Sequence, residues 1–304
     1  MQGTFIGFNT AGITYEDHFM ALLLKVKHRN GMFQTYYLQA PVLADLLMVL
    51  ANRMSIFLQR LQQDGENEAQ KVELLAYNET LIANTPEIDM LEVQNPNPEL
   101  RIMSITLKPG ETESTLILML QNEQIATLRI DDRQVEALIL GIQQSLTMAA
   151  DTKLNEYLAL ALDFVPLYTV DLTTQPNIEY QQYAQEEWKL NLFNHHLGVL
   201  YSYEQEEGKK VLSGAVIKTS AAHQSDFEKS IALRLIEKSQ KLKQVHNQHT
   251  PYQIFSKVIP SAPGQMLTKD ECLKSLHEFY VATKASLSHA LPNPSPIKLN
   301  SSFL

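Results

Sequence analysis

Residues 42–54 read VLADLLMVLANRM, and residues 134–146, which lie 92 positions later, read QVEALILGIQQSL. The three- and four-residue spacing of the apolar side chains predicts an amphipathic helix in each stretch. A repeat of this kind predicts that one supersecondary unit occurs twice in the chain. The matching apolar positions are Leu43, Leu46, Leu47, Met48, Leu50 and Met54 in the first stretch and Val135, Leu138, Ile139, Leu140, Ile142 and Leu146 in the second.

Strand-like segments come before both predicted helices. In the first unit, two of them flank residues 28–31 (His-Arg-Asn-Gly), and Asn-Gly tolerates the positive φ that a tight hairpin turn requires. Each unit therefore reads strand, strand, strand, helix. The predicted strands are residues 4–9, 21–27 and 32–39 in the first unit and residues 100–107, 114–121 and 124–131 in the second.

These two tandem units, residues 1–65 and 99–150, predict the fold class. We expect an α+β protein in which residues 1–150 form a pseudo-two-fold antiparallel-sheet domain, with two sheets or one merged sheet. Chance similarity between two ordinary sheet-and-helix units is the competing interpretation. Residues 85–99 contain three prolines and few repeating apolar positions, which predicts a connector between the units.

A second α+β domain is expected over residues 151–291. Ser225 and Glu228 have the spacing of a capping box, in which each side chain satisfies a backbone N–H near a helix start. Gly214, inside a strand-like segment, indicates a close approach of backbone. Residues 292–304 form a proline-rich tail. Strands are predicted at residues 166–172, 188–203, 210–219 and 254–259, and helices at residues 227–246 and 270–291.

The composition indicates a cytoplasmic globular protein. Of 304 residues, 44% are hydrophobic and 19% charged, which is ordinary for a chain with a sizeable core. The single cysteine, Cys272, cannot form an internal disulfide, which fits a reducing compartment. No run of about 18 uninterrupted apolar residues occurs, and the first residues lack a secretory pattern, so no membrane span is expected.

Charge is uneven along the chain. Residues 1–150 carry 10 Lys and Arg against 18 Asp and Glu, which accounts for −8 of the total of −9. Proteins that bind nucleic acid broadly show a basic stripe, so the acidic first half argues against that class. The one basic cluster, Lys238, Lys241 and Lys243, is the weak candidate surface for nucleic acid, although such a run is usually a solvated helix face.

No motif with recognisable chemistry emerges. Glycine-rich phosphate loops and the Gly-x-Ser-x-Gly nucleophile motif are absent, and we expect no cofactor. Cys272 follows two acidic residues, which raise a thiol pKa, and is expected to be inert. Zinc needs three or four converging ligands, so the pair His246 and His249 is a weak metal candidate, and no metal is expected. The weak catalytic candidates are His195, His196, His223 and Asp226.

Residues 1–9 (MQGTFIGFN) and residues 34–50 (QTYYLQAPVLADLLMVL) resemble the YjeJ-like group of uncharacterised enterobacterial proteins. The resemblance implies a cytoplasmic bacterial protein. It carries no catalytic motif and therefore no site residue to transfer.

The absence of an active-site pattern, together with the repeated scaffold, favours a non-enzymatic protein-interaction or scaffold protein. We expect a protein partner or a homo-oligomer, because short sheet meanders leave edge strands that can pair with another chain. The alternative is a hydrolase or other enzyme whose His and carboxylate residues converge from distant positions in the C-terminal half. Binding of nucleic acid by the helix around Lys238 is a third hypothesis.

Overall fold

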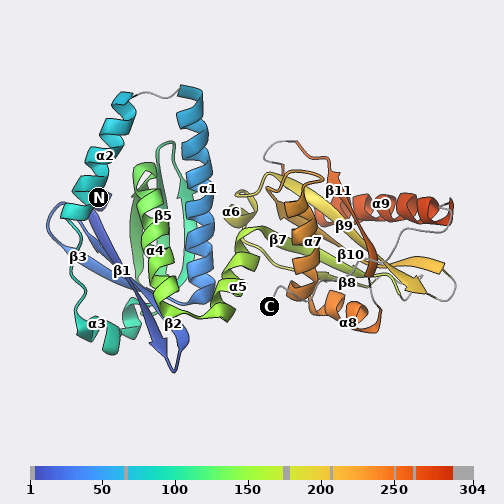
Figure 1. Ribbon diagram of the computed structural model, residues 1–304, viewed down its shortest axis with the longest axis horizontal. Coiled ribbons are helices and arrows are strands. Elements are labelled where there is room, and N and C mark those ends of the chain that lie inside the picture. Colours follow the sequence, from blue (N-terminus) through green and yellow to red (C-terminus); the bar gives the residue numbers. More distant parts are fainter. Residues whose placement is uncertain are drawn as a thin grey trace. The chain divides into compact units, whose positions relative to one another are not determined.

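The chain forms two compact units in the computed structural model, Met1–Leu162 and Asp163–Leu304 (Figure 1). The structure describes residues 4–64, 68–173, 179–205, 208–249, 251–262 and 265–289. Both units combine helices with antiparallel sheets, so the predicted α+β class is confirmed. The predicted tail, residues 292–304, lies outside the described residues.

Two three-stranded antiparallel sheets build the N-terminal unit, in the orders β1-β2-β3 and β4-β5-β6. One parallel bridge, between Tyr37 and Arg101, connects them. The Asn-Gly hairpin is present, with Gly31 at a φ of 79°. The strands are β1 (Gly7–Tyr15), β2 (His18–Lys27), β3 (Phe33–Leu38), β4 (Ile102–Pro109), β5 (Glu113–Leu120) and β6 (Ile125–Asp131).

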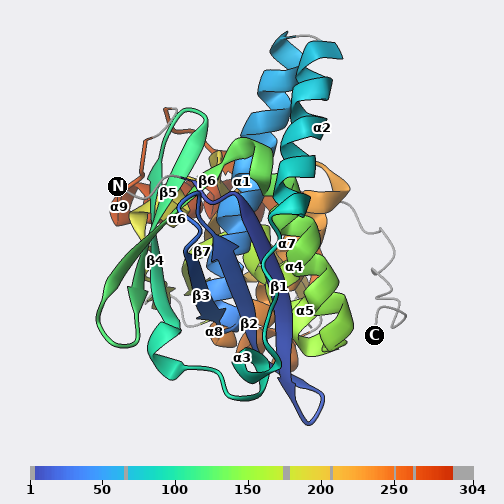
Figure 2. The same cartoon turned by 90° about the vertical axis from the view of Figure 1, so that its left-hand side faces the viewer.

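A helix follows each of these sheets, as the periodicity predicted. α1 (Ala40–Asp64) follows β3, and α4 (Val135–Ala149) follows β6 after a 3-10 turn, η2 (Asp132–Gln134). α1 and α2 (Glu68–Ala83) form a helical hairpin that extends past the strands (Figure 2). The predicted domain boundary falls at Ala150, where the backbone is left-handed with a φ of 52°. The first compact unit continues through α5 (Thr152–Leu162), which packs on α1.

α1 is the central helix of the N-terminal unit. Its residues Val42–Leu50 are buried on nearly every side, Asp45 excepted, against both sheets, α4 and α5. A helix that is apolar all round is one that a core surrounds. The same property gives Ala40–Gln63 the length and mean hydropathy, 1.6, of a helix that could cross a membrane, although half of that window is buried inside the protein.

Two adjacent aspartates start α4 and have different roles. Asp131 caps the 3-10 turn η2 that leads into α4: its side chain accepts from the Arg133 N–H, and its own N–H donates to the side chain of Gln134. Asp132 is buried instead and accepts two hydrogen bonds, of 2.8 and 2.7 Å, from the guanidinium of Arg53 in α1. This ion pair fixes the helix of the first strand-and-helix unit against the start of the helix of the second.

The C-terminal unit is built on one five-stranded antiparallel sheet, in the order β11-β9-β10-β7-β8. Its strands are β7 (Phe164–Asp171), β8 (Glu179–Gln182), β9 (His195–Gln205), β10 (Gly208–Thr219) and β11 (Pro251–Ile259). α7 (Asp226–Lys238) and α8 (Gln240–Gln248) pack on one face of the sheet, and α9 (Lys269–His289) packs on the other.

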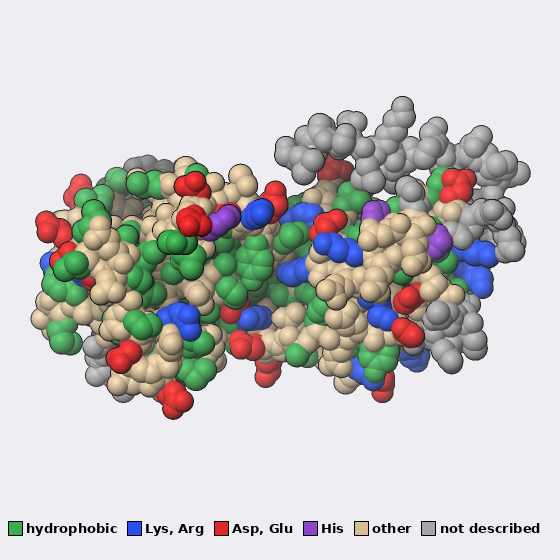
Figure 3. Space-filling view, turned by 90° about the horizontal axis from the view of Figure 1, so that it is seen from below, with side chains coloured by type: hydrophobic (Ala, Val, Ile, Leu, Met, Phe, Trp, Pro, Cys, Tyr) green, Lys and Arg blue, Asp and Glu red, His purple; other side chains and the backbone are tan. Residues whose placement is uncertain are grey.

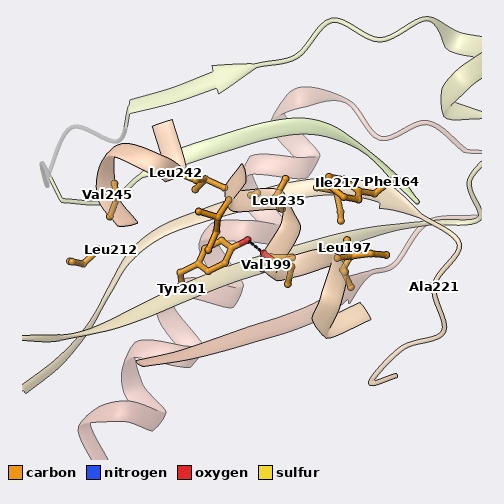
Figure 4. Close-up of a cluster of buried hydrophobic side chains, with 14 of the residues drawn as sticks. Phe164, Leu197, Val199, Tyr201, Leu212, Ile217, Ala221, Leu235, Leu242 and Val245 are labelled. Carbon is orange, nitrogen blue, oxygen red and sulfur yellow. Dashed lines mark hydrogen bonds between the residues drawn. The ribbon is translucent and has the colours of Figure 1, made fainter. Parts of the chain in front are cut away.

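Alternation along β9 separates these two faces. Leu197, Val199 and Tyr201 point toward α7 and α8, whereas Leu200 belongs to the core under α9. Figure 4 shows the α7 side, where the hydroxyl of fully buried Tyr201 donates to the Ala232 carbonyl at 2.6 Å. A buried hydroxyl needs such a partner to offset its lost hydration.

Two predicted elements of the C-terminal unit are wrong in detail. Residues 188–203 are not one strand: the chain forms a helical turn, α6 (Glu187–Leu190), and β9 begins only at His195. The predicted helix over residues 227–246 breaks at Ser239, whose backbone is extended. The Ser239 hydroxyl there accepts from the Leu242 N–H and starts α8 as a new helix.

Candidate functional site

The sheet β4-β5-β6 has an apolar outer face that no described element of the N-terminal unit covers. Even-numbered leucines of β5, such as Leu116 and Leu118, point inward and are buried. The odd-numbered Ile117 and Met119 point outward, and the register places them beside Thr127 and Ile125 of β6. We define the outer face of β4–β6 as the exposed apolar residues Met103, Ile117, Met119 and Ile125, with the bordering Thr106, Thr115 and Thr127.

The sheet β1-β2-β3, by contrast, is covered on its outer side. The register aligns Ala11, Leu23 and Tyr37 across the three strands, and Leu23 and Tyr37 are buried there. Their cover is the predicted connector, which carries α3 (Met90–Gln94) and contributes Ile88, Val93 and Leu100 to the cluster. The connector thus covers the first sheet in addition to linking the two strand-and-helix repeats of the N-terminal unit.

Glu92 of α3 anchors this layer. Its carboxylate accepts hydrogen bonds from Lys25 at 2.7 Å and from Thr35 at 2.8 Å, and its carbonyl accepts one from the Tyr37 hydroxyl at 3.0 Å. Burial by itself would raise the pKa of Glu92, but the bonds from Lys25, the Asp89 N–H and Thr35 outweigh it and lower that pKa. The anchor is therefore a charged carboxylate held by complementary donors.

In the C-terminal unit, the structure brings two of the four predicted catalytic residues near one carboxylate. Glu228, in the first turn of α7, is 1% exposed. It accepts a hydrogen bond from His223 Nδ1 at 2.9 Å, from the Gln224 N–H at 3.2 Å and from the Ser256 hydroxyl. The charge of Glu228 also acts on His195 and raises its pKa, but burial has the larger effect, so the pKa of His195 is lowered.

This arrangement differs from the predicted capping box. Ser225 does cap α7, since its hydroxyl accepts from the Glu228 N–H at 3.1 Å. The reciprocal bond goes to the Gln224 N–H rather than to Ser225, because the Glu228 carboxylate turns inward to His223 and Ser256. The resulting cluster is a histidine oriented by a buried carboxylate.

The other two predicted catalytic residues lie apart from this cluster. His196 follows His195 in β9 and so points to the opposite sheet face, where it is fully buried. Burial, followed by the charges of the neighbouring Lys218 and His195, lowers its pKa to about 4. Asp226 is exposed and pairs with Lys229 at 2.9 Å along α7.

Within the described residues, the structure brings no third ligand to the weak metal candidates His246 and His249. His249 packs edge-on against the ring of Tyr203, with centroids 6.0 Å apart, and His246 lies on the last turn of α8. Among the residues that the structure describes, no group of three or more His, Cys, Asp or Glu side chains is placed to hold a metal ion. Cys272 is fully buried, and burial followed by the charge of Glu271 raises the pKa of its thiol to about 11.

The lysines of the basic cluster have partners within the protein. Lys241 pairs with Glu179 at 3.0 Å, and Lys243 pairs with Glu237 at 2.9 Å. The Lys238 ammonium lies 4.9 Å from the centre of the Phe164 ring, and burial lowers its pKa to about 8. On the surface shown in Figure 3, basic and acidic side chains of the C-terminal unit are interspersed.

Sequence reasoning missed the outer face of β4–β6, and it assigned Glu228 only a capping role. The run Leu116-Ile117-Leu118-Met119-Leu120 is apolar at every position, which is the pattern of a strand with two apolar faces. It could have indicated that this sheet has a second apolar face.

Comparison with known proteins places the chain in a family. The model of the YjeJ-like family matches residues 1–286. The chain is similar to the uncharacterized protein YjeJ of Escherichia coli (strain K12), with 32% identity over 277 residues that cover 90% of this chain and 94% of that protein. No solved structure matches. The chain therefore belongs to the YjeJ-like family, as the resemblance of residues 1–9 and 34–50 indicated.

Proposed function

We propose that this protein is a non-enzymatic interaction protein that self-associates through the outer face of β4–β6. The observation that carries the proposal is the contrast between the two sheets of the N-terminal unit. The face formed by Ala11, Leu23 and Tyr37 has its own cover in α3, whereas Ile117 and Met119 have none among the described residues of the same unit. Exposed apolar patches rimmed by polar residues mark association sites.

The repeated scaffold supports the same proposal. We infer that the two sheet-and-helix units are related by a pseudo-two-fold, on the basis of the 92-residue match and the shared element order. If so, the outer faces of β1–β3 and β4–β6 are equivalent, and the connector that carries α3 covers the first of them. A second copy of the chain is the simplest cover for the other face.

Charges at the two ends of this face suit a two-fold arrangement. Lys108 and Arg129 lie at one end, aligned across Thr115, where Arg129 also pairs with Glu113 at 3.7 Å, and the exposed Glu123 lies in the β5–β6 turn at the other. Two copies packed face to face with antiparallel strands bring Lys108 of each over Glu123 in the turn of its partner. Sheets packed in this way lie about 10 Å apart and interdigitate their side chains, and closed two-fold contacts are the commonest in homo-oligomers.

Sedimentation equilibrium tests the proposal. The wild-type protein should sediment as a dimer in the micromolar range, and Met119→Lys should shift it to monomer, because a charge is then buried without a partner. Met148→Lys is the matched control, since Met148 is 80% exposed on α4 and should leave the dimer intact. A wild-type protein that stays monomeric over this range would rule out self-association.

We also infer that the protein acts in the cytoplasm, with α1 as a core helix. A single cysteine and the burial of α1 around the Arg53–Asp132 pair support this inference. Fractionation of cells that produce the protein tests it: the protein should stay in the supernatant of a high-speed spin without detergent. Recovery in the membrane pellet that only detergent releases would contradict it.

A hydrolase is the second candidate function, and the His223–Glu228 pair is the observation that favours it. A carboxylate on Nδ1 fixes the tautomer of His223 and leaves Nε2 to accept a proton, as in a general base. Hydrolysis of simple ester and phosphoester substrates by the wild type, lost in His223→Gln but kept in His246→Gln, would support this candidate. Equal rates in all three proteins would exclude it.

A further inference from the structure

A cavity lies between α9 and the sheet of the C-terminal unit, separate from the outer face of β4–β6 and from the Glu228 cluster. Its volume is about 180 Å³. Five aliphatic side chains form most of its wall: Val170 and Leu172 from β7 and the residue after it, Leu200 from β9, and Leu273 and Leu276 from α9. The cavity is open to solvent, and two of its lining residues, Tyr180 and His277, are exposed.

Gly214 shapes the floor of the cavity. It lies in β10 between Leu200 and Val170, opposite each of them in the strand register. A Cβ at this position would lie 2.8 Å from Leu200 Cδ2 and 3.4 Å from Val170 Cγ2. The missing side chain allows the side chains of these two residues to close over the strand.

Three rings carry the polar groups of the cavity. Tyr180 from β8 and His277 and Tyr280 from α9 complete the lining. Lys269 donates a hydrogen bond to the Tyr180 hydroxyl at 2.7 Å, which leaves the hydroxyl's own hydrogen to donate to an acceptor. An apolar wall with a few polar groups at one side is the usual form of a small-molecule site.

We propose that this cavity binds a small neutral aromatic molecule with one hydrogen-bonding group, of about the size of a substituted phenol. The volume supports this size, because an apolar cavity of about 150 Å³ accepts benzene. The rings of Tyr180, His277 and Tyr280 offer edge and face contacts to an aromatic ligand. The lining holds no Lys or Arg, and the nearby Lys269 ammonium already donates to the Tyr180 hydroxyl, which favours a neutral ligand over a carboxylate.

Isothermal titration calorimetry of the full chain with 4-methylphenol tests the proposal. Leu273→Phe fills the cavity from α9, and because Leu273 is only half-buried the larger side chain is tolerated. We expect it to weaken binding by roughly tenfold or more. Leu287→Phe is the matched control, since the same exchange on the same helix lies outside the lining and should change the affinity by less than about twofold.

Tyr180→Phe tests the polar side of the site. It should weaken the binding of 4-methylphenol about fivefold and leave that of toluene unchanged, because only the phenol loses a hydrogen bond. The fluorescence of Trp188, which belongs to the same unit, verifies that each variant is folded.

Three results would overturn the proposal. The first is no binding by the wild type, and the second is equal binding by wild type and Leu273→Phe. The third is binding by a Phe303→Ser variant alone, which would assign the cavity to the apolar C-terminus of the chain itself.

Discussion

Replacement of Arg53 by methionine should destabilise the N-terminal unit by about 3 kcal/mol. Arg53 is 4% exposed, and its guanidinium forms two bonds to Asp132, of 2.8 and 2.7 Å, and one each to the carbonyls of Gly110 and Glu111, both 3.0 Å. Removal of one partner of a buried ion pair costs about 3–5 kcal/mol, because the other charge stays buried. Arg60 also contacts Asp132 and keeps the cost at the lower end of that range.

Urea unfolding measures this loss in each unit separately. With a slope of about 2 kcal/mol per molar urea, a loss of about 3 kcal/mol lowers the midpoint by roughly 1.5 M. The lone tryptophan, Trp188, belongs to the C-terminal unit, whereas far-UV circular dichroism reports both units. We therefore expect the Arg53→Met variant to show an early dichroism transition and an unchanged fluorescence midpoint.

A double variant isolates the ionic part of the effect. Arg53→Met/Asp132→Leu leaves neither of these two charges buried, so it should regain at least about 1 kcal/mol relative to Arg53→Met alone. A single variant within about 0.5 kcal/mol of the wild type, or a double variant that is still less stable than the single one, would refute this account of the pair.

Three further predictions concern single positions. Gly214→Ala should lower the free energy of unfolding by about 1–3 kcal/mol, because its Cβ would lie 2.9 Å from the Val199 carbonyl oxygen. Gly198→Ala is the control: the nearest atom to its Cβ would be 3.6 Å away, so the same urea titration should show a nearly neutral effect. Glu92→Ala should release α3 and speed amide hydrogen exchange across residues 89–95 relative to the exposed control Glu99→Ala; unchanged exchange would contradict the anchoring role. The pKa of His196 is about 4 in the folded protein and 6.5 ordinarily, so the unfolded chain binds the proton more readily. The free energy of unfolding should therefore fall by roughly 3 kcal/mol as the pH decreases from about 6.5 to about 4. His196→Leu should flatten that dependence in urea titrations at several pH values, and an unaltered slope would show that the buried imidazole is not its source.

The regular elements of the fold were predictable because their apolar spacing is local. α1 and α4 follow directly from the periodicity of residues 42–54 and 134–146, and the first hairpin follows from Asn30-Gly31. The break at Ser239 was not predictable from spacing, because Leu235 and Leu242 are seven residues apart and fit one continuous helix face. The break depends on the Ser239 hydroxyl, which caps α8, and the spacing of apolar residues contains no information about that hydroxyl.

The candidate site was harder to predict because its residues meet only in three dimensions. His223 and Glu228 are close in sequence, yet Ser256 reaches the same carboxylate from β11, and no local pattern connects the two segments. Adjacent His195 and His196 go to opposite faces of the sheet, so only one of them can lie near Glu228. The exposure of the outer face of β4–β6 could not be predicted, because Ile117 and Met119 are as apolar as the buried core residues on either side of them.

Methionine oxidation tests the central claim of self-association most directly. Met103 and Met119 belong to the outer face of β4–β6 and are 46% and 47% exposed, and Met20 and Met32 elsewhere in the same unit are each 49% exposed. In dilute protein the four thioethers should react with hydrogen peroxide at similar rates, as measured by mass spectrometry. At higher protein concentration we predict that Met103 and Met119 become protected while Met20 and Met32 do not. Equal oxidation of all four at every concentration would contradict the claim.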